Sequence, residues 1–186
     1  MNDQNTKKVD SARLSGAVTS AFEWVGAAVA ALAVVAVLFS LFFRIVKVDG
    51  DSMCDTLVNG EKLLLSAIVS NPRYGDIVVI TQDNDEPLIK RVIGLEGDKI
   101  YIDNNSGIVY RNGQPLDEPY VKGGFTRSFQ QSGAVTVPEG CVYVLGDNRP
   151  VSKDSRNPSV GCPSLNNVVG VVTFRLNPFE SLRNGD

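Results

Sequence analysis

A serine and a lysine could form a catalytic pair in this chain of 186 residues, which contains no histidine. Ser52 lies in the turn-rich stretch Val48–Leu57 (VDGDSMCDTL), shortly after a long apolar run. A serine nucleophile commonly passes its proton to a histidine, so the missing residue excludes a Ser-His-Asp triad and any histidine-ligated zinc. A lysine that has lost its proton can serve as the base instead.

Lys90 is the lysine whose surroundings best suit a base. Free lysine titrates near about 10.4, and lowering its pKa by about two units requires burial among apolar groups, at roughly 3 kcal/mol. Lys90 lies in the apolar segment Pro87–Ile93 (PLIKRVI), where strand alternation places Leu88 and Val92 on its face. Arg91 points to the opposite face and cannot act as a base.

Each of these two residues, taken alone, also has an ordinary structural interpretation. A single lysine in a strand is commonly a solvated charge that prevents edge-to-edge aggregation. A serine in a turn rich in Gly and Asp commonly caps that turn. The catalytic hypothesis therefore requires that the fold bring Ser52 and Lys90 together.

The apolar run before Ser52 is predicted to span a membrane. Val25–Phe43 contains no charged side chain, and its 19 residues at about 1.5 Å each cross about 30 Å of hydrocarbon. Trp24, Arg44 and Lys47 are suitable interfacial anchors. A cleaved signal peptide would have a shorter run and a small-residue cleavage site, and a core helix apolar on every face would need a larger protein around it. The basic residues on the two sides are balanced, so charge leaves the orientation open.

The remainder of the chain is predicted to be mainly β, a single sheet- or barrel-like domain tethered by one helix. Short segments rich in β-branched residues alternate with turn residues, and no long helical period follows residue 44. The predicted strands are Glu61–Ile68, Asp76–Thr81, Pro87–Ile93, Lys99–Ile102, Ile108–Arg111, Gly140–Leu145 and Val168–Phe174.

Composition removes further classes of function. A net charge of −3 argues against a nucleic-acid partner, which would favour a basic surface. Cys54, Cys141 and Cys162 are too few for a disulfide framework; a Cys141–Cys162 bridge is one alternative in an oxidising compartment, and free thiols are the other. The cysteines lack metal-ligand spacing, so we expect no metal and no cofactor.

Four stretches, in order, resemble the conserved boxes of the bacterial type I signal peptidases, the membrane-bound Ser/Lys branch. The resemblance covers most of the chain, and the ordered set is far more specific than a Ser-Met pair alone. The stretches are Val48–Leu57 for the nucleophile, Arg73–Val79 for the following strand, Lys90–Asp98 for the lysine, and Gly146–Arg156 with the later Gly170 for the final box.

The resemblance implies a role for each matched residue. Ser52 would attack the scissile carbonyl, and its backbone N–H would donate to the oxyanion. Lys90 would act as general base and then as general acid to the leaving amine. Ser152 would hydrogen-bond the Lys90 amine and fix its direction.

Three charged residues of the final box are expected to be scaffold. Asp154 and Arg156 could share one strand face and form a salt bridge under the site, with Asp147 nearby. Solvated loop charges are the alternative for all three. Gly50 stands where some family members carry a hydroxyl that adds an oxyanion donor. Asp55 replaces a usual proline, and close to Lys90 it would stabilise the ammonium.

The implied substrates are secretory preproteins, cut after an Ala-x-Ala pattern. The peptide is expected to bind extended, adding a strand near Asp49–Ser52 and Pro87–Lys90. Apolar residues around Met53 are expected to dip into the lipid bilayer. The residues predicted to contact substrate are Asp49, Gly50, Asp51, Met53, Leu88 and Ile89.

The family places residues 1–23 in the bacterial cytoplasm, residues 24–43 across the cell membrane, and residues 44–186 outside it. Self-cleaving repressor proteases use the same dyad, but they are soluble and fused to DNA-binding segments. The Ser-x-x-Lys motif of penicillin-recognising enzymes and the Gly-x-Ser-x-Gly elbow are missing. A membrane-tethered module or silent paralogue that holds peptides without cutting them remains the alternative from another class.

Overall fold

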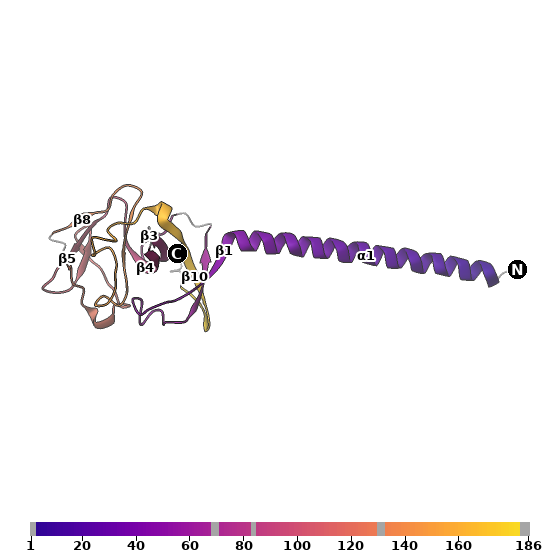
Figure 1. Ribbon diagram of the computed structural model, residues 1–186, viewed down its shortest axis with the longest axis horizontal. Coiled ribbons are helices and arrows are strands. Elements are labelled where there is room, and N and C mark those ends of the chain that lie inside the picture. Colours follow the sequence, from indigo (N-terminus) through magenta and orange to yellow (C-terminus); the bar gives the residue numbers. More distant parts are fainter. Residues whose placement is uncertain (1–2, 68–70, 83–84, 130–132, 183–186) are drawn as a thin grey trace. The chain divides into compact units, whose positions relative to one another are not determined.

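The computed structural model in Figure 1 describes residues 3–67, 71–82, 85–129 and 133–182. The chain divides into two compact units, Met1–Phe42 and Phe43–Asp186. The first unit is one helix, α1 (Asp3–Phe42), which begins far before the predicted span. Its segment Phe22–Phe42 is long and apolar enough to cross a membrane, and its large apolar side chains are exposed. Phe43, placed in the predicted span, instead opens the first strand.

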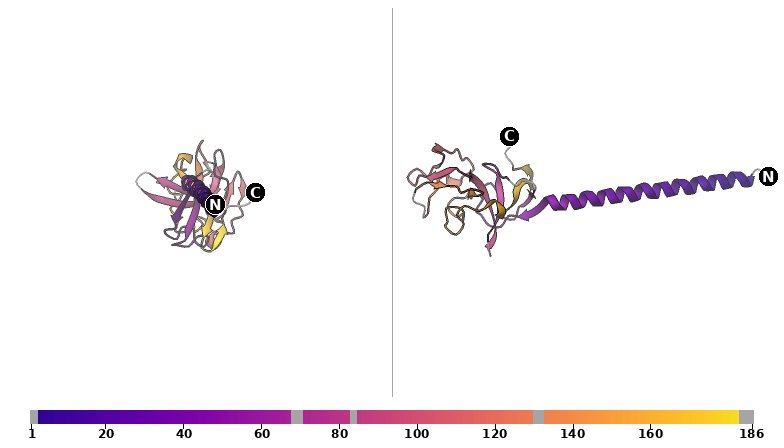
Figure 2. Two further views of the ribbon diagram at one scale, coloured as in Figure 1. Left: turned by 90° about the vertical axis from the view of Figure 1, so that its right-hand side faces the viewer. Right: turned by 90° about the horizontal axis from the view of Figure 1, so that it is seen from above.

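The second unit is mainly β, as predicted, and is built from two antiparallel sheets (Figures 1 and 2). The larger sheet has the order β1-β2-β10-β3-β4-β9, and β11 pairs with β10. Its strands are β1 (Phe43–Lys47), β2 (Lys62–Ser66), β3 (Ile77–Gln82), β4 (Asp85–Leu95), β9 (Val142–Leu145), β10 (Val168–Leu176) and β11 (Phe179–Ser181).

The smaller sheet has the order β7-β6-β5-β8. Two short 3-10 helices, η1 and η2, lie in the connections. These elements are β5 (Lys99–Ile102), β6 (Val109–Arg111), β7 (Gln114–Pro115), η1 (Lys122–Gly124), β8 (Val135–Thr136) and η2 (Leu165–Asn167).

Each of the seven predicted strands has a counterpart, namely β2, β3, β4, β5, β6, β9 and β10; β5 has the predicted bounds, and the others differ from the prediction by one or more residues at one or both ends. Ile68, the predicted end of the first of them, lies outside the described residues. Strands β1, β7, β8 and β11 were not predicted. They are short and owe their conformation to pairing with neighbouring strands.

The apolar residues of β3 explain how the larger sheet is stabilised. Ile77 and Val79 join one buried cluster, whereas Val78 and Ile80 join another on the opposite face. A strand covered on both faces has a continuous apolar run instead of strict alternation. A third cluster joins β4 and β9 to the smaller sheet, so the two sheets share buried apolar contacts.

Strand β4 is longer than either of its neighbours, and this leaves part of one edge open. On one side, residues 85–91 of β4 pair with β3. On the other side, β9 pairs only with Arg91–Leu95 of β4. The β9-side edge therefore has no partner strand, among the described residues, along the segment that leads to Lys90. A strand edge with unused backbone groups is a binding surface for an extended peptide.

Candidate active site

The fold brings Ser52 and Lys90 into direct contact. Lys90 lies in β4, and Ser52 lies in the turn-rich loop between β1 and β2. The Lys90 Nζ is 2.8 Å from Ser52 Oγ, and it also donates to the Ile89 carbonyl at 2.8 Å. The lysine is only 2 % exposed, whereas Ser52 is half-buried. The amine is thus shielded from water while the hydroxyl stays accessible to a substrate.

Burial changes the protonation of this lysine in the predicted direction. Removal from water lowers the pKa of Lys90 from 10.5 to about 8, against the opposing influence of the Asp154 and Asp147 carboxylates. A charged amine is costly to desolvate, and the neutral form is not. With this pKa, about a tenth of the molecules hold a neutral amine at pH 7.

The two opposing carboxylates are each neutralised by an arginine. Asp147, fully buried, accepts from Arg91 Nε at 2.9 Å and Nη2 at 2.7 Å. Asp154, 1 % exposed, accepts from Arg156 Nε and Nη2, both at 2.8 Å. Such two-pronged pairs are among the strongest ionic hydrogen bonds. They confine the negative charge, which would otherwise favour the ammonium form of the neighbouring lysine.

The setting of these pairs differs from the prediction in two ways. Asp154 and Arg156 lie in a turn after β9 and do not share a strand face; the bend lets the arginine fold back onto the aspartate. Asp147 is paired with Arg91, which sequence analysis assigned no partner. Arg91 also lies 4.0 Å from the centre of the Tyr120 ring, and Thr56 Oγ1 donates to Asp147 at 2.5 Å.

Asn148 holds the loop that carries the nucleophile. Its backbone N–H donates to the Ser52 carbonyl at 3.0 Å, and its side-chain Nδ2 donates to the Asp51 carbonyl at 2.9 Å. The second bond fixes the peptide unit that contains the Ser52 N–H. Sequence analysis placed Asn148 in the final box but assigned it no role, because its partners lie far away in the chain.

Gly146 packs so closely against the nucleophile loop that no side chain fits there. A Cβ at this position would lie 2.5 Å from the Ser52 carbonyl oxygen and 2.2 Å from Ser152 Oγ. Its backbone N–H donates to Asp154 Oδ2 at 3.1 Å. The glycine thus allows the loop after β9 to approach Ser52.

Ser152 lies beside this contact but does not bond the lysine in the structure. It is 5 % exposed, and its Oγ has no hydrogen-bond partner within the described residues. The expected bond to Lys90 is missing because the amine is directed at Ser52 and at the Ile89 carbonyl. A buried hydroxyl without a partner is unusual in a stable core.

The residues predicted to contact substrate have different exposures. Asp49, Gly50 and Asp51 are exposed, and Leu88 and Ile89 are half-buried along the open part of β4. All five keep some solvent-accessible surface, and their contact with substrate stays a prediction.

Met53 is the exception among them. It is 1 % exposed and packs in a core cluster with Leu57 and Ile77, so the substrate contact predicted for it was wrong. The expectation that apolar residues around Met53 dip into lipid stays a prediction. Asp55 points into solvent, with 81 % of its side chain exposed, and pairs with Lys122 at 3.4 Å. It does not act on the pKa of Lys90.

The cysteines take no part in this arrangement. All three are free, so the Cys141–Cys162 alternative is not realised in the structure. Burial is the main cause that raises the pKa of Cys162, to about 11. In the described part of the chain no cluster of side chains could hold a metal ion.

Comparisons with known proteins identify the family of the chain. The family model described as signal peptidase, peptidase S26, matches residues 21–177. Signal peptidase I of Bacillus caldolyticus is 39% identical over 164 residues, which are 81% of this chain and 88% of that protein. Signal peptidase I S of Bacillus subtilis (strain 168) is 35% identical over 178 residues, 88% of this chain and 93% of that protein.

One solved structure is also similar, that of a signal peptidase I from Enterococcus faecalis V583. It is 33% identical, and the match covers 55% of this chain and 97% of that one, with a TM-score of 0.47.

The chain belongs to the signal peptidase family, peptidase S26. Within that family, its relatives from both Bacillus species are signal peptidases of type I, and the matches run over most of each protein. The resemblance seen in the four boxes is confirmed, and the chain is a peptidase of this family.

Replacing Gly146 with alanine is expected to reduce peptidase activity at least tenfold while the protein still folds. The added Cβ would displace Ser52 or Ser152 from its position. We would measure cleavage and thermal unfolding of the full chain in detergent micelles. Gly26→Ala, where a Cβ meets open space on the helix α1, is the control. Full activity in Gly146→Ala would contradict this close packing.

Replacing Lys90 with methionine is expected to stabilise the fold by about 3 kcal/mol at pH 7, because a buried amine with a lowered pKa destabilises the folded state. The folded-state pKa lies below the unfolded one, so the unfolded chain binds more protons between about pH 8 and 10.5. Wild-type stability therefore rises with pH across that window.

The advantage of Lys90→Met should be largest below pH 8 and shrink by about 2 kcal/mol at pH 9.5. Denaturant titrations of both full-length proteins in micelles measure it, with the exposed Lys99→Met as the control. A difference that stays constant with pH would show that the amine is not shifted.

Proposed function

We propose that this protein is a membrane-anchored serine endopeptidase that removes N-terminal signal peptides from secreted preproteins after an Ala-x-Ala-like site. Ser52 is the nucleophile and neutral Lys90 is the general base. The observation that carries the proposal is the 2.8 Å contact between Lys90 Nζ and Ser52 Oγ, made by an amine that is almost entirely buried.

The chemistry requires one proton to move twice. The lone pair of the neutral amine takes the Ser52 hydroxyl proton as Oγ attacks the scissile carbonyl. The resulting ammonium gives that proton to the leaving amine, and the acyl-enzyme is then hydrolysed by a water that Lys90 activates in the same way. A base with a pKa near 8 is well matched to both steps close to neutral pH.

Supporting groups complete the proposed mechanism. The Ser52 N–H stabilises the oxyanion, and Asn148 keeps it oriented through the Asp51 carbonyl. A neutral amine has two N–H groups, of which one donates to the Ile89 carbonyl. The structure shows no bond between the amine and Ser152 Oγ. We propose that the second N–H turns from Ser52 to that hydroxyl when the lone pair of the neutral amine faces Ser52. Asp147, Asp154 and Arg156 are scaffold in this proposal.

The substrate is proposed to bind as an extra strand. The open edge of β4, up to Lys90, offers backbone partners to an extended peptide, and the exposed Asp49–Ser52 segment lies at the nucleophile end. The helix segment Phe22–Phe42 would hold the enzyme at the membrane, with the catalytic unit on the extracytoplasmic side of the bacterial cell. Tethering raises the local concentration of signal peptides that remain in the bilayer.

The direct test is cleavage of a preprotein in vesicles by the wild type, Ser52→Ala and Lys90→Ala. Each substitution is expected to lower the rate by at least about a thousandfold, because the two residues act as one unit. Ser106→Ala and Lys99→Ala, both exposed, are matched controls. Cleavage that survives either active-site substitution would rule out the dyad, and binding without cleavage by the wild type would favour a peptide-holding module.

The pH dependence of kcat/KM should follow the ionisation of Lys90. The rate should rise about tenfold per pH unit below pH 8 and level off above it, because only the neutral amine can accept the proton. Single-turnover cleavage between pH 6 and 10 measures this profile. A flat profile with chemistry rate-limiting, or a rise centred near 10.5, would contradict it.

A further inference from the structure

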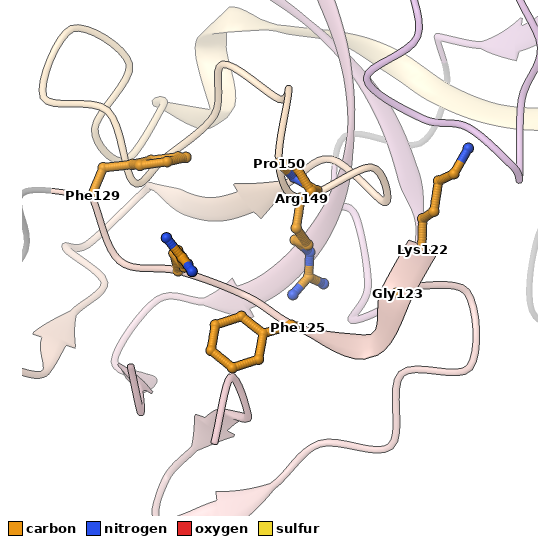
Figure 3. Close-up of a pocket in the computed structure, with 7 residues that line it drawn as sticks. Lys122, Gly123, Phe125, Phe129, Arg149 and Pro150 are labelled. Carbon is orange, nitrogen blue, oxygen red and sulfur yellow. The ribbon is translucent and has the colours of Figure 1, made fainter. Parts of the chain in front are cut away.

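A cavity lies next to the segment Gly146–Pro150, which follows β9, and has no part in the mechanism above. Its volume is about 450 Å³, and Figure 3 shows Lys122 at one end, Phe129 at the other, and Arg149 with Pro150 between them. Phe125 and Arg127 complete most of the lining. The cavity thus combines aromatic faces with three basic side chains.

The floor of this cavity is rigid. The Phe125 ring packs directly against Gly107, where an added Cβ would lie only 2.5 Å from the ring carbon Cγ. Arg149 is fully buried, and its guanidinium donates to both carboxylate oxygens of Glu118, at 2.6 and 3.1 Å. It also donates to Thr126 Oγ1. The charge of Arg149 is therefore balanced, and this arginine shapes the cavity without attracting an anion.

The other two cations have little compensation. Arg127 is exposed and lies 5.7 Å from the centre of the Phe125 ring, and no carboxylate among the described residues pairs with it. Lys122 has only the loose pair with Asp55, at 3.4 Å, in which both side chains are largely in water. The cavity therefore has an apolar floor and two side chains, Arg127 and Lys122, whose positive charge is weakly balanced. Such a surface suits an extended peptide segment that carries a carboxylate.

The cavity lining is connected to the segment Gly146–Pro150 at two points. Arg149 and Pro150 directly follow Asn148, which holds the Ser52 carbonyl. At the other end, the Lys122 N–H donates to the Asp147 carbonyl at 3.3 Å. The cavity is therefore fixed to the segment that positions the nucleophile.

The course of the substrate leads toward this cavity. A peptide on the open edge of β4 must leave the sheet near Lys90, because β9 occupies that edge from Arg91 onward. The chain that follows β9 is the segment Gly146–Pro150, and in the proposed binding mode the residues after the scissile bond pass over it. This step rests on the proposed function, in which the signal peptide occupies the edge up to Lys90.

We propose that this cavity binds the first residues of the mature protein, after the cut, and selects for an acidic side chain there through Arg127 and Lys122. An aspartate or glutamate gains an ionic partner on entry, whereas a lysine or arginine meets two like charges. Pairs at exposed sites change affinity about two- to fivefold, and salt weakens them.

The experiment uses the full-length protein in vesicles of neutral lipid. The substrates are three versions of one preprotein that differ only in carrying Glu, Gln or Lys, scanned through the first few positions after the cut. We compare kcat/KM for the wild type, Arg127→Glu and the control Lys99→Glu, which makes the same charge change on β5. At one or more adjacent positions, the wild type should cleave the Glu version about two- to fivefold better than the Lys version.

Arg127→Glu should reverse that preference, measured as the ratio of kcat/KM for the Glu and Lys versions within each variant, and Lys99→Glu should leave the wild-type ratio unchanged. Added salt should reduce the preference. An unchanged preference in Arg127→Glu, with cleavage still abolished by Ser52→Ala, would overturn this inference alone. Loss of Ser52 dependence would instead overturn the proposed function.

A lipid contact gives a different pattern. If Arg127→Glu slowed all three substrates equally, and only on vesicles with anionic lipid, the cations would face lipid headgroups and the proposal would be wrong.

Discussion

Burial of the Lys90 amine beside the Ser52 hydroxyl constrains the rest of the domain. An amine that is 2 % exposed prefers to be neutral, and any bare carboxylate nearby would reverse that preference. Two carboxylates are nevertheless present, at Asp147 and Asp154. Each is held by an arginine in a two-pronged ion pair, so they can order the backbone around the site while the amine stays easy to deprotonate.

One segment, the loop that follows β9, connects the separate parts of the site. Gly146 gives it room to approach the nucleophile, and Asn148 bonds both carbonyls that flank Ser52. Ser152 brings a buried hydroxyl to the same place, and Arg149 shapes the adjoining cavity. These contacts explain why the final box, Gly146–Arg156, has so many matched residues: nearly every one of them makes a distinct contact. Substitutions there should disturb several functions together.

The sequence indicated most of the sheet and the central pair, but not how the pair is supported. The strands with long β-branched runs, such as β3, were predictable because both of their faces are buried. Two-residue strands such as β7 carry no such pattern. The Arg91–Asp147 pair joins residues 56 positions apart, and no local signal marks it. The substrate contact predicted for Met53 was wrong because a turn residue can still point into a core.

The most direct test of the central claim is the ionisation of the Lys90 side chain itself. The full-length protein in micelles can be labelled with ¹³C at lysine Cε, and the resonance assigned by its loss in Lys90→Met. An NMR titration should then show the Lys90 resonance with a midpoint at about pH 8, below the 10.5 of a free lysine. A Lys90 midpoint near the ordinary lysine value of 10.5 would contradict the claim that burial keeps this amine ready to act as a base.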